Sequence, residues 1–351
     1  MAEEKTRIAV ILFNLGGPDQ PESIEPFLFN LFNDPAIIGA PNPIRWLLAK
    51  MISRRRAPVA AEIYEHLGGK SPLLELTRDQ AQSLERELRD QGEVRCFVCM
   101  RYWHPMSEEV AHEVEIFSPD RIVLLPLYPQ YSTTTSESSI KDWRRAAKKA
   151  GLDVDTRTIC CYPTEPGFVE AVSELVGAAY AEASKTGAPR ILFSAHGLPK
   201  KVIARGDPYQ WQVEQTAAAV MARLGDGFAS ADWAVCYQSR VGPLEWIGPA
   251  TEDELTRAGA DKVPVVLVPI AFVSEHSETL VELDIEYREE AHRLGVPAYH
   301  RVPAVGVRAA FIDGLAGLVR AALGREATLS DGCGGRTCEA RFGKCAQGGR
   351  L

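Results

Sequence analysis

A histidine stands where a predicted strand ends. His196 directly follows the apolar run Ile191–Ala195 and precedes Gly197, which permits a sharp turn. A neutral imidazole can accept a proton at neutral pH or ligate a divalent metal ion. Lone histidines are commonly structural, so it is the position at the end of a strand that makes His196 a candidate for catalysis or metal binding.

Carboxylates recur at helical spacing after a second predicted strand, Val263–Ile270. Five of them would form one acidic stripe on a helix, namely Glu275, Glu278, Glu282, Glu286 and Glu289. Like charges at this spacing cost roughly 0.2–0.5 kcal/mol each. We therefore interpret the first three, beside His276, as functional and the last two as a solvated face. Closely spaced carboxylates can pass protons along the row and attract a divalent cation.

A third group combines aromatic, cationic and hydroxyl side chains at the ends of strands in the first half. It comprises residues 14–18 (Asn-Leu-Gly-Gly-Pro), 101–105 (Arg-Tyr-Trp-His-Pro) and 128–135 (Tyr-Pro-Gln-Tyr-Ser-Thr-Thr-Thr). Gly16 and Gly17 lack the flanking pattern of a phosphate-binding loop. This composition favours a flat, apolar ligand with anionic edges.

The segment 43–56 is apolar at helical spacing and strongly basic in between. Its apolar residues are Ile44, Leu47, Leu48, Met51 and Ile52, and five Lys and Arg residues are interleaved with them. A helix docked on the core would give this pattern. The alternative is an exposed apolar lip that contacts a membrane or a lipophilic substrate.

Three of the eight cysteines, Cys333, Cys338 and Cys345, lie in a glycine-rich tail that cannot build a core. Their spacing matches neither common zinc-finger pairs nor ferredoxin runs, yet three thiols in such a tail suggest ligands. A fourth ligand must then come from elsewhere, and Cys160 or Cys161 is the obvious source. Cys96 and Cys99 lie on a predicted strand and are interpreted as structural.

The elements that must position these residues alternate between short apolar runs and helical patterns, which is typical of parallel α/β sheets. The runs come in matched pairs in the same order, beginning at Ile11 and Ile191, at Cys99 and Cys236, and at Ile122 and Val265. We predict two similar Rossmann-like or flavodoxin-like halves, residues 1–160 and 161–325, each a small parallel sheet flanked by helices, followed by a C-terminal extension, 326–351. Ligands of such folds bind beyond the carboxyl ends of the strands.

Composition restricts the function classes. The chain has 351 residues, a formal net charge of −8 and 46% hydrophobic residues. A negative chain has no general attraction to nucleic acid, so no nucleic-acid partner is expected. Nothing at the N-terminus resembles a signal peptide and no apolar run could span a bilayer. We expect a cytoplasmic protein, peripheral on the inner membrane if it touches one.

Taken together, the motifs resemble those of the ferrochelatase family over nearly the whole chain. The segments that carry the resemblance are 14–18, 68–72 (Gly-Gly-Lys-Ser-Pro), 101–105, 127–132, 194–199, 237–243 with Trp246, and 272–280. The resemblance implies the chelatase fold and a metal chelatase of the lyase class. That enzyme inserts Fe²⁺ into protoporphyrin IX in the last step of haem biosynthesis, forming protohaem and releasing two protons.

The resemblance also implies roles for individual residues. His196 would be the active-site histidine and Glu278 the carboxylate that faces it across the porphyrin, both able to ligate the substrate Fe²⁺, with Glu275 and Glu282 in an acidic row that leads from the pocket. Either His196 or the row of glutamates that begins at Glu278 could supply the base that accepts the protons, and either could deliver the iron. Residues 43–58 would form a membrane-facing lip. The residues expected to line the pocket or hold propionates are Leu15, Arg101, Tyr102, Tyr128 and Trp246.

Many members of the family carry a 2Fe-2S cluster on the C-terminal extension. The resemblance implies such a cluster here, held by Cys333, Cys338, Cys345 and either Cys160 or Cys161. The animal enzymes take one ligand from a Tyr-Ser-Cys-Ser segment where this chain has Thr133, which shifts the fourth ligand to the junction pair. Zinc is the rival metal, because it also accepts four thiolates.

Other functions compete with this interpretation. A different tetrapyrrole chelatase, acting on coproporphyrin or inserting cobalt, would share the fold, and a haem- or iron-binding protein could use the same pocket without catalysis. A transferase that uses a nucleotide sugar is disfavoured because the sequence contains no phosphate-binding loop. Both a monomer and a homodimer are compatible with the sequence.

Overall fold

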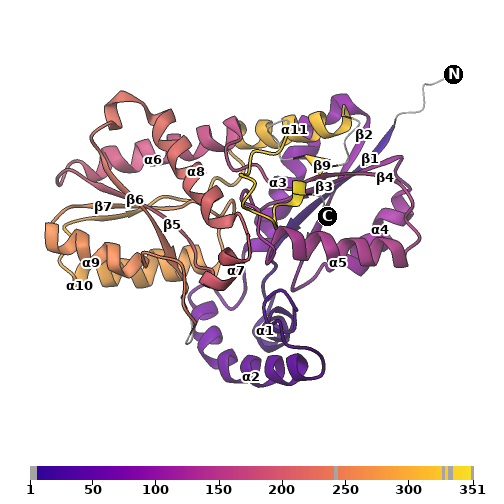
Figure 1. Cartoon of the computed structure of the whole chain (residues 1–351), viewed down its shortest axis with the longest axis horizontal. Coiled ribbons are helices and arrows are strands. Elements are labelled where there is room, and N and C mark those ends of the chain that lie inside the picture. Colours follow the sequence, from indigo (N-terminus) through magenta and orange to yellow (C-terminus); the bar gives the residue numbers. More distant parts are fainter. Residues whose placement is uncertain (1–5, 241–243, 326–328, 331–334, 349–351) are drawn as a thin grey trace. The chain divides into compact units, whose positions relative to one another are not determined.

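The chain forms two compact units, each built on a parallel β-sheet with helices packed on its faces (Figure 1). The computed structural model describes residues 6–240, 244–325, 329–330 and 335–348. Unit 1 comprises residues 1–161, 315–334 and 351, and unit 2 comprises residues 162–314 and 335–350. The expected α/β fold with two sheet-containing halves is confirmed.

The sheet of unit 1 has five parallel strands in the order β2-β1-β3-β4-β9. The strands are β1 (Arg7–Asn14), β2 (Glu93–Met100), β3 (Arg121–Pro126), β4 (Asp155–Ile159) and β9 (Leu329–Ser330). Every residue of β1 from Ile8 to Asn14 is buried, because helices cover both faces of a parallel sheet. This explains why β1 is apolar at consecutive positions rather than at alternate ones.

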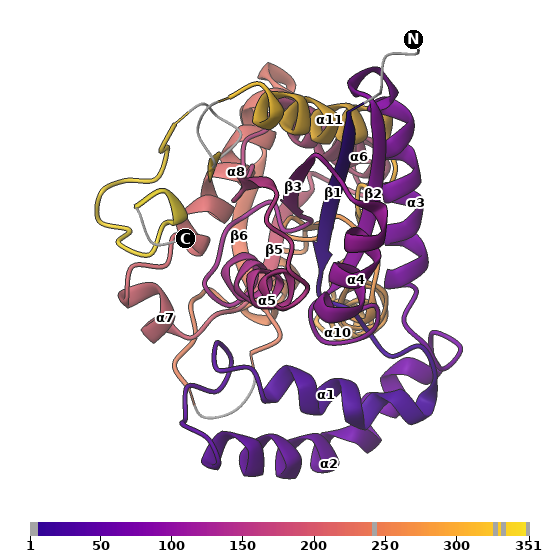
Figure 2. The same cartoon turned by 90° about the vertical axis from the view of Figure 1, so that its right-hand side faces the viewer.

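The helices of unit 1 are α1 (Ile24–Phe32), α2 (Ile44–Glu65), α3 (Leu73–Glu87), α4 (Ser107–Phe117) and α5 (Ser136–Lys149). α4 and α5 share one buried apolar cluster with β1, β2 and β3, and α3 contacts β2. α1 and α2 lie side by side, apart from the sheet (Figure 2). They form their own small apolar cluster around Phe27 and Tyr64.

The apolar stripe predicted in segment 43–56 is only partly exposed. Ile44, Leu47 and Met51 are 56%, 65% and 59% exposed, Leu48 and Ile52 are half-buried, and the small residues Ala49 and Ser53 are buried. α2 therefore packs through its small residues and part of the stripe, and it leaves three large apolar side chains in solvent. Within the described ranges, no helix is both long and apolar enough to cross a membrane.

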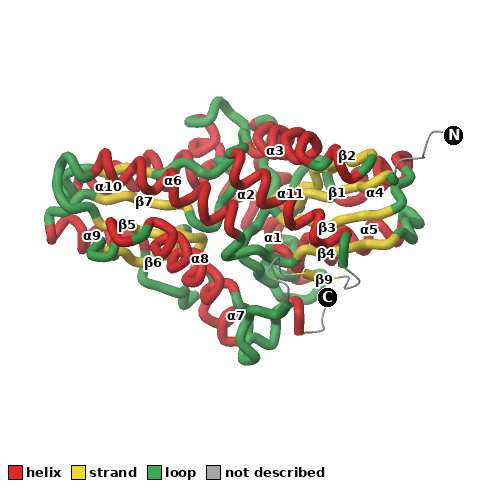
Figure 3. Tube along the Cα trace, turned by 90° about the horizontal axis from the view of Figure 1, so that it is seen from above, coloured by secondary structure: helices red, strands yellow, loops and turns green. Residues whose placement is uncertain are grey.

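The sheet of unit 2 has four parallel strands in the order β6-β5-β7-β8. Figure 3 shows β6, β5 and β7 side by side. The strands are β5 (Arg190–His196), β6 (Asp232–Gln238), β7 (Val265–Pro269) and β8 (Tyr299–Arg301). This order repeats the order of the first four strands of unit 1, so the internal repeat seen in the sequence is confirmed. The apolar runs of the sequence predict six strands, at residues 8–14, 94–100, 121–127, 191–195, 233–237 and 263–270. All six are present, with bounds within two residues of those expected.

The helices of unit 2 cover both faces of its sheet. α9 (Thr251–Asp261), a π-helix (Glu278–Glu286) and α10 (Tyr287–Arg293) share one apolar cluster with β5, β6 and β7. The remaining helices are α6 (Pro166–Ala183), α7 (Lys200–Ala204), α8 (Tyr209–Leu224) and α11 (Ala309–Leu323), the last of which leads from unit 2 into unit 1. α6 and α8 pack together, α6 against β7 and β8 and α8 against β6. Because β5 pairs in parallel with β6 and with β7, the carboxyl ends of these three strands lie at one edge of the sheet.

Candidate active site

An imidazole and a carboxylate face each other at this edge of unit 2. His196 is the last residue of β5 and Glu278 is the first residue of the π-helix. His196 Nδ1 lies 2.9 Å from Glu278 Oε2, and the His196 side chain is 40% exposed. This geometry offers a proton acceptor and a metal ligand at one point, as the sequence predicts for both residues.

The two groups stabilise each other's charge. Burial lowers the pKa of His196, but the facing Glu278 more than offsets this, so that the pKa of His196 is raised above its ordinary value. Burial raises the pKa of Glu278, yet His196 and then His276 lower it more, and it falls well below its ordinary value. The pairing therefore favours the protonated form of His196 and the ionised form of Glu278.

A second histidine approaches the same carboxylate. His276 Nε2 lies 3.8 Å from Glu278 Oε1, and the ring stacks on Phe272 at a centroid distance of 4.6 Å. His276 is only 5% exposed, and its Nδ1 is buried without a hydrogen-bond partner. Sequence reasoning noted His276 beside the acidic row but did not select it. The signal was its position between two of the selected glutamates.

Residues at the end of β6 complete the surroundings of Glu278. Gln238 Nε2 lies 3.4 Å and Ser239 Oγ 3.3 Å from Glu278 Oε2. The Ser239 amide donates to Glu282 Oε1 at 2.9 Å, from a residue whose φ of 59° is uncommon outside glycine. Sequence reasoning missed both residues, although β6 neighbours β5 and ends at the same edge of the sheet.

Glu282 is the second carboxylate of the site. It lies one π-helical turn after Glu278 and accepts hydrogen bonds from the amide and hydroxyl of Ser239 and from the hydroxyl of Tyr287. Burial, and next the negative charge of Glu278, raise the pKa of Glu282 to about 7. The side chain can therefore hold or release a proton near neutral pH.

The prediction that Glu275 belongs to the same helical stripe is wrong. The helix begins after it, and Glu275 instead accepts hydrogen bonds from Arg301 Nη1 at 2.8 Å and from the Ala304 amide at 2.9 Å. Glu278, Glu282 and Glu286 lie on a π-helix, and Glu289 lies on α10. Glu278 is near enough to Glu282 for its charge to raise the pKa of Glu282. Glu275 is thus neutralised by Arg301, whose side chain is 10% exposed.

The other predicted pocket residue of unit 2 lies beside His196. Trp246 pairs with Pro199 in a short bridge, and its ring lies close to Gly197, where an added Cβ would be 3.5 Å from Trp246 Cε3. The indole Nε1 of Trp246 is buried and has no hydrogen-bond partner among the described residues. The aromatic side chain therefore borders the backbone turn that follows the histidine.

Two of the predicted residues of unit 1, Arg101 and Tyr102, belong to a polar cluster around Asp34. Arg101 Nη2 and the Tyr102 hydroxyl approach Asp34 Oδ2 at 2.8 and 2.9 Å, and Ser138 also donates to it. The Asp34 side chain is 2% exposed and the Arg101 side chain 16%. Asp34 follows α1, so this cluster fixes the start of the connection to α2. Sequence reasoning did not find Asp34.

Two further predicted residues of unit 1 lie in its apolar regions. Leu15 packs against the cluster that α1 and α2 form. Tyr128 packs against the core shared by α4 and α5, where burial raises its pKa well above the ordinary value.

The described cysteines of the predicted cluster are buried in two places. Cys338 and Cys345 pack with Phe342 and Trp211 in unit 2. Cys160 and Cys161 are buried in unit 1 with their sulfurs 3.4 Å apart. Cys333 lies outside the described residues. Across the part of the chain that the structure describes, no three His, Cys, Asp or Glu side chains are grouped as a metal site.

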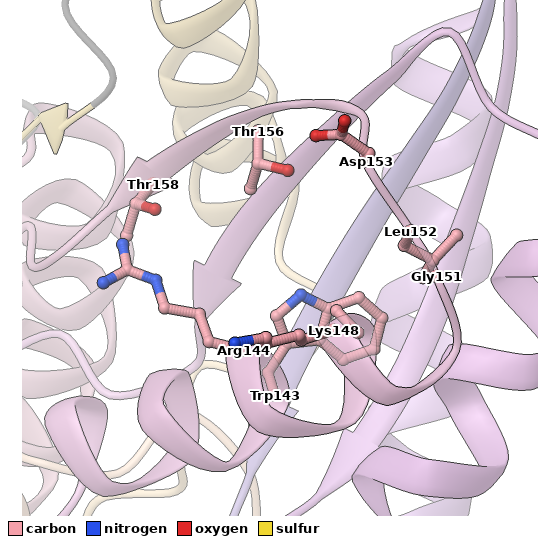
Figure 4. A pocket seen from close by; sticks show the side chains of 9 residues that line it. Trp143, Arg144, Lys148, Gly151, Leu152, Asp153, Thr156 and Thr158 are labelled. Atoms are coloured by element: carbon pink, nitrogen blue, oxygen red, sulfur yellow. The ribbon is translucent and has the colours of Figure 1, made fainter.

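A hollow of about 400 Å³ between α5 and β4 belongs to unit 1 rather than to the unit that contains His196 (Figure 4). It is lined by Trp143, Arg144, Ala147, Lys148, Gly151, Leu152, Asp153, Thr156 and Thr158. Arg144 and Lys148 are exposed, and none of these lining residues is a histidine or cysteine.

The sequence is similar to those of known proteins over nearly its whole length. A family model described as Ferrochelatase matches residues 7–323. The chain is 53% identical over 343 residues to a ferrochelatase of Caulobacter vibrioides (strain NA1000 / CB15N), covering 97% of each protein. It is equally identical over 343 residues to a ferrochelatase of Phenylobacterium zucineum (strain HLK1), covering 97% of this chain and 98% of the relative.

A solved structure supports the fold. SirB from Bacillus subtilis with Fe³⁺ superposes with a TM-score of 0.52 over 91% of this chain and 96% of that chain, at 11% sequence identity. This likeness concerns the arrangement of the elements alone.

Replacing Glu282 by Gln should change how stability depends on pH. The folded pKa is about 7 against an ordinary value of 4.5, so between these values the folded chain binds more protons than the unfolded chain. The contribution of Glu282 to stability therefore declines as the pH rises through this window. Because Gln cannot ionise, the variant's stability relative to wild type should increase by roughly 1–3 kcal/mol between pH 5 and pH 7.5 and level off above.

Urea unfolding at pH 5, 6, 7 and 8 measures this difference. Glu289→Gln, a substitution of an exposed glutamate on α10, is the matched control and should give a difference that does not vary with pH. A difference between Glu282→Gln and wild type that is also constant would contradict the raised pKa.

Proposed function

Because the chain belongs to the ferrochelatase family, whose members insert iron into a porphyrin in haem biosynthesis, we propose that it converts protoporphyrin IX and Fe²⁺ into protohaem at the pair His196 and Glu278. The pairing of these two side chains, 2.9 Å apart, is the observation that carries the proposal. The substrates are then the porphyrin and the Fe²⁺ ion, and the two pyrrole protons are released.

Metal insertion requires that two protons leave the porphyrin and that Fe²⁺ loses its water ligands. Glu278 supplies oxygen donors, and His196 in its neutral form supplies a nitrogen donor. Such groups are suitable both for a divalent iron and for accepting a pyrrole proton. Ser239 and Gln238 contact Glu278 and fix its orientation. Glu282, with a pKa of about 7, provides a further proton site that leads away from the pair toward Tyr287 and Glu252.

Binding of the porphyrin is assigned to aromatic and apolar groups. Trp246 and Leu15 would contact the flat face of the macrocycle, and Tyr128 would add an aromatic surface. Because Arg101 and Tyr102 already contact Asp34, we propose that they act on propionates only together with that carboxylate. An apolar site that favours a distorted macrocycle would promote metal insertion by stabilising the transition state over the flat substrate.

We also propose that α2 is a lip that contacts the cytoplasmic face of a membrane. Ile44, Trp46, Leu47 and Met51 are each at least 49% exposed, and Arg54 to Arg56 on the same helix are exposed as well. Apolar side chains with flanking cations favour an anionic lipid surface, from which a lipophilic porphyrin could be taken.

A 2Fe-2S cluster is the proposed cofactor of the C-terminal extension. Cys338 and Cys345 lie buried in one small cluster, and Gln212 Nε2 donates a hydrogen bond to Cys338 Sγ at 3.1 Å, as sulfurs that ligate iron commonly receive. These residues fit two of the four ligands. Cys333 and either Cys160 or Cys161 would supply the others, and the cluster would add metal–sulfur bonds that hold the extension in place.

His196→Ala should reduce turnover to below about 1% of wild type, because general acid–base groups contribute about 10²–10⁴-fold. Glu278→Gln should have a similar effect, whereas Glu289→Gln should retain nearly full activity. Anaerobic metallation of protoporphyrin and coproporphyrin, with Fe²⁺ and Co²⁺ in parallel, measures this and separates the competing chelatases. Full activity of His196→Ala, or porphyrin binding without metallation by wild type, would contradict the proposal.

The double substitution Leu47→Ser and Met51→Ser should weaken association with anionic liposomes and porphyrin capture by roughly tenfold or more, since each buried apolar side chain contributes about 1.5–3 kcal/mol. The melting temperature should hardly change, because both residues are exposed. Ile116→Ser on α4, which is 70% exposed, is the matched control and should leave liposome binding intact. A lower melting temperature with normal liposome binding would support a structural role instead.

Protein purified without oxygen should be red-brown and contain about two irons and two acid-labile sulfides per chain. Cys338→Ser and Cys345→Ser should each abolish the colour, and Cys160→Ser and Cys161→Ser, made separately, should do so in one case only. Cys96→Ser is the control. Colourless folded protein with one zinc per chain would identify zinc as the bound metal and refute the cluster.

A further inference from the structure

The start of α8 contacts the backbone of the catalytic histidine. The hydroxyl of Tyr209, the first residue of α8, donates a hydrogen bond to the carbonyl oxygen of His196 at 3.1 Å. Tyr209 is 6% exposed, so this hydroxyl has little access to water as an alternative partner. The bond holds the last peptide of β5, from which the His196 ring projects.

The same turn of α8 carries the docked tail, residues 335–348. The rings of Trp211 and Phe342 pack with centroids 5.6 Å apart, and the Gln212 amide donates to Cys338 Sγ at 3.1 Å. Figure 2 shows the tail, in yellow, beside α7 and α8. Residues 209, 211 and 212 therefore contact the site and the tail from a single helical turn.

The tail also contacts the backbone that leads into α8. The Lys344 amide donates to the Gly206 carbonyl at 3.1 Å, and a Cβ at Gly206 would lie 2.9 Å from the Gly343 nitrogen. Gly206 has a φ of 95°, and the next residue, Asp207, accepts a hydrogen bond from the Tyr209 amide at 3.0 Å. The backbone of the tail at Gly343 and Lys344 thus packs directly against the backbone at Gly206, and a side chain at Gly206 would not fit between them.

We propose that the tail acts on metal insertion through α8, with Tyr209 as the positioning residue for His196. A docked tail fixes Gly206 and the first turn of α8, and Tyr209 transmits that fixed position to the His196 backbone. Misplacement of a reacting group by about 1 Å can cost about 10²-fold in rate, so a small displacement of this turn is enough to matter. The inference rests on the proposed role of His196 in metal insertion.

The test uses the full-length chain and compares Tyr209→Phe, Trp211→Ala and the double variant. Each single variant should lower kcat by roughly threefold to thirtyfold and leave KM for the porphyrin within about twofold, because the loss concerns orientation rather than binding. The double variant should be no slower than the slower single variant, since both changes interrupt one connection. Trp211→Phe keeps an aromatic ring against Phe342 and should recover most of the rate.

Gln210→Ala is the matched control. Gln210 lies between Tyr209 and Trp211 in the chain, but its side chain contacts Glu214 on the next turn instead. The control should keep the wild-type kcat. Thermal unfolding of every variant checks that the fold is retained. If Trp211→Ala does not fold, Phe342→Leu, which removes the same ring contact from the side of the tail, takes its place.

A readout without substrate follows the histidine itself. In protein labelled with ¹⁵N-histidine, the imidazole signal of His196, assigned by its loss in His196→Ala, should shift in both Tyr209→Phe and Trp211→Ala and stay unchanged in Gln210→Ala. A normal kcat and an unchanged signal in Tyr209→Phe would overturn the inference, as would single effects that multiply in the double variant. Full activity of His196→Ala would instead overturn the proposed function, while the signals would still report whether the tail positions His196.

Discussion

His196 and Glu278 face each other at the edge of one sheet, and each stabilises the opposite charge on its partner. The two side chains are 40% and 23% exposed, so water also contributes to solvating these charges. His276, Gln238 and Ser239 approach the same carboxylate. The stability of this edge of the sheet and its reactivity therefore depend on the same contacts. The side chains that surround Glu278 also stabilise its negative charge.

Excess negative charge around the pair is handled by neutralising each carboxylate differently. Arg301 binds both Glu275 and Asp284, and Arg288 also pairs with Asp284, so these two carboxylates face two cations and add little negative potential to the site. Among the described residues Glu282 forms no ion pair with a lysine or arginine, and its raised pKa lets it retain a proton near neutral pH. Glu278 and Glu282 lie on the same π-helix, and the charge of Glu278 contributes to the raised pKa of Glu282. In unit 1 a comparable solution appears at Asp34, whose buried carboxylate is satisfied by Arg101, Tyr102 and Ser138.

The amino-acid sequence by itself determined the sheets, the repeat and the ends of the strands that matter. Consecutive apolar residues bounded by Gly and Pro specify buried parallel strands locally, so the six predicted strands were found within two residues of their observed bounds. Since ligands of such folds bind at the carboxyl ends of strands, His196 and Glu278 could be selected without coordinates. β4, β8 and β9 were not predicted, because short edge strands such as Tyr299–Arg301 carry too few residues for a pattern.

Only the tertiary structure decided which side chains meet. His196 and Glu278 are 82 residues apart, and their contact depends on the pairing of β5 with β7, which periodicity does not specify. The helical spacing of Glu275 suggested one row, but a π-helix that begins after it and an arginine from β8 separate it from the others. The outward orientation of Leu47 follows from the packing of Ala49 and Ser53, and the contact of Tyr209 with His196 from the docking of α8 on β6. Local propensity thus fixed the elements, whereas burial and contacts between distant segments fixed the charges, the partners and the chemistry of the site.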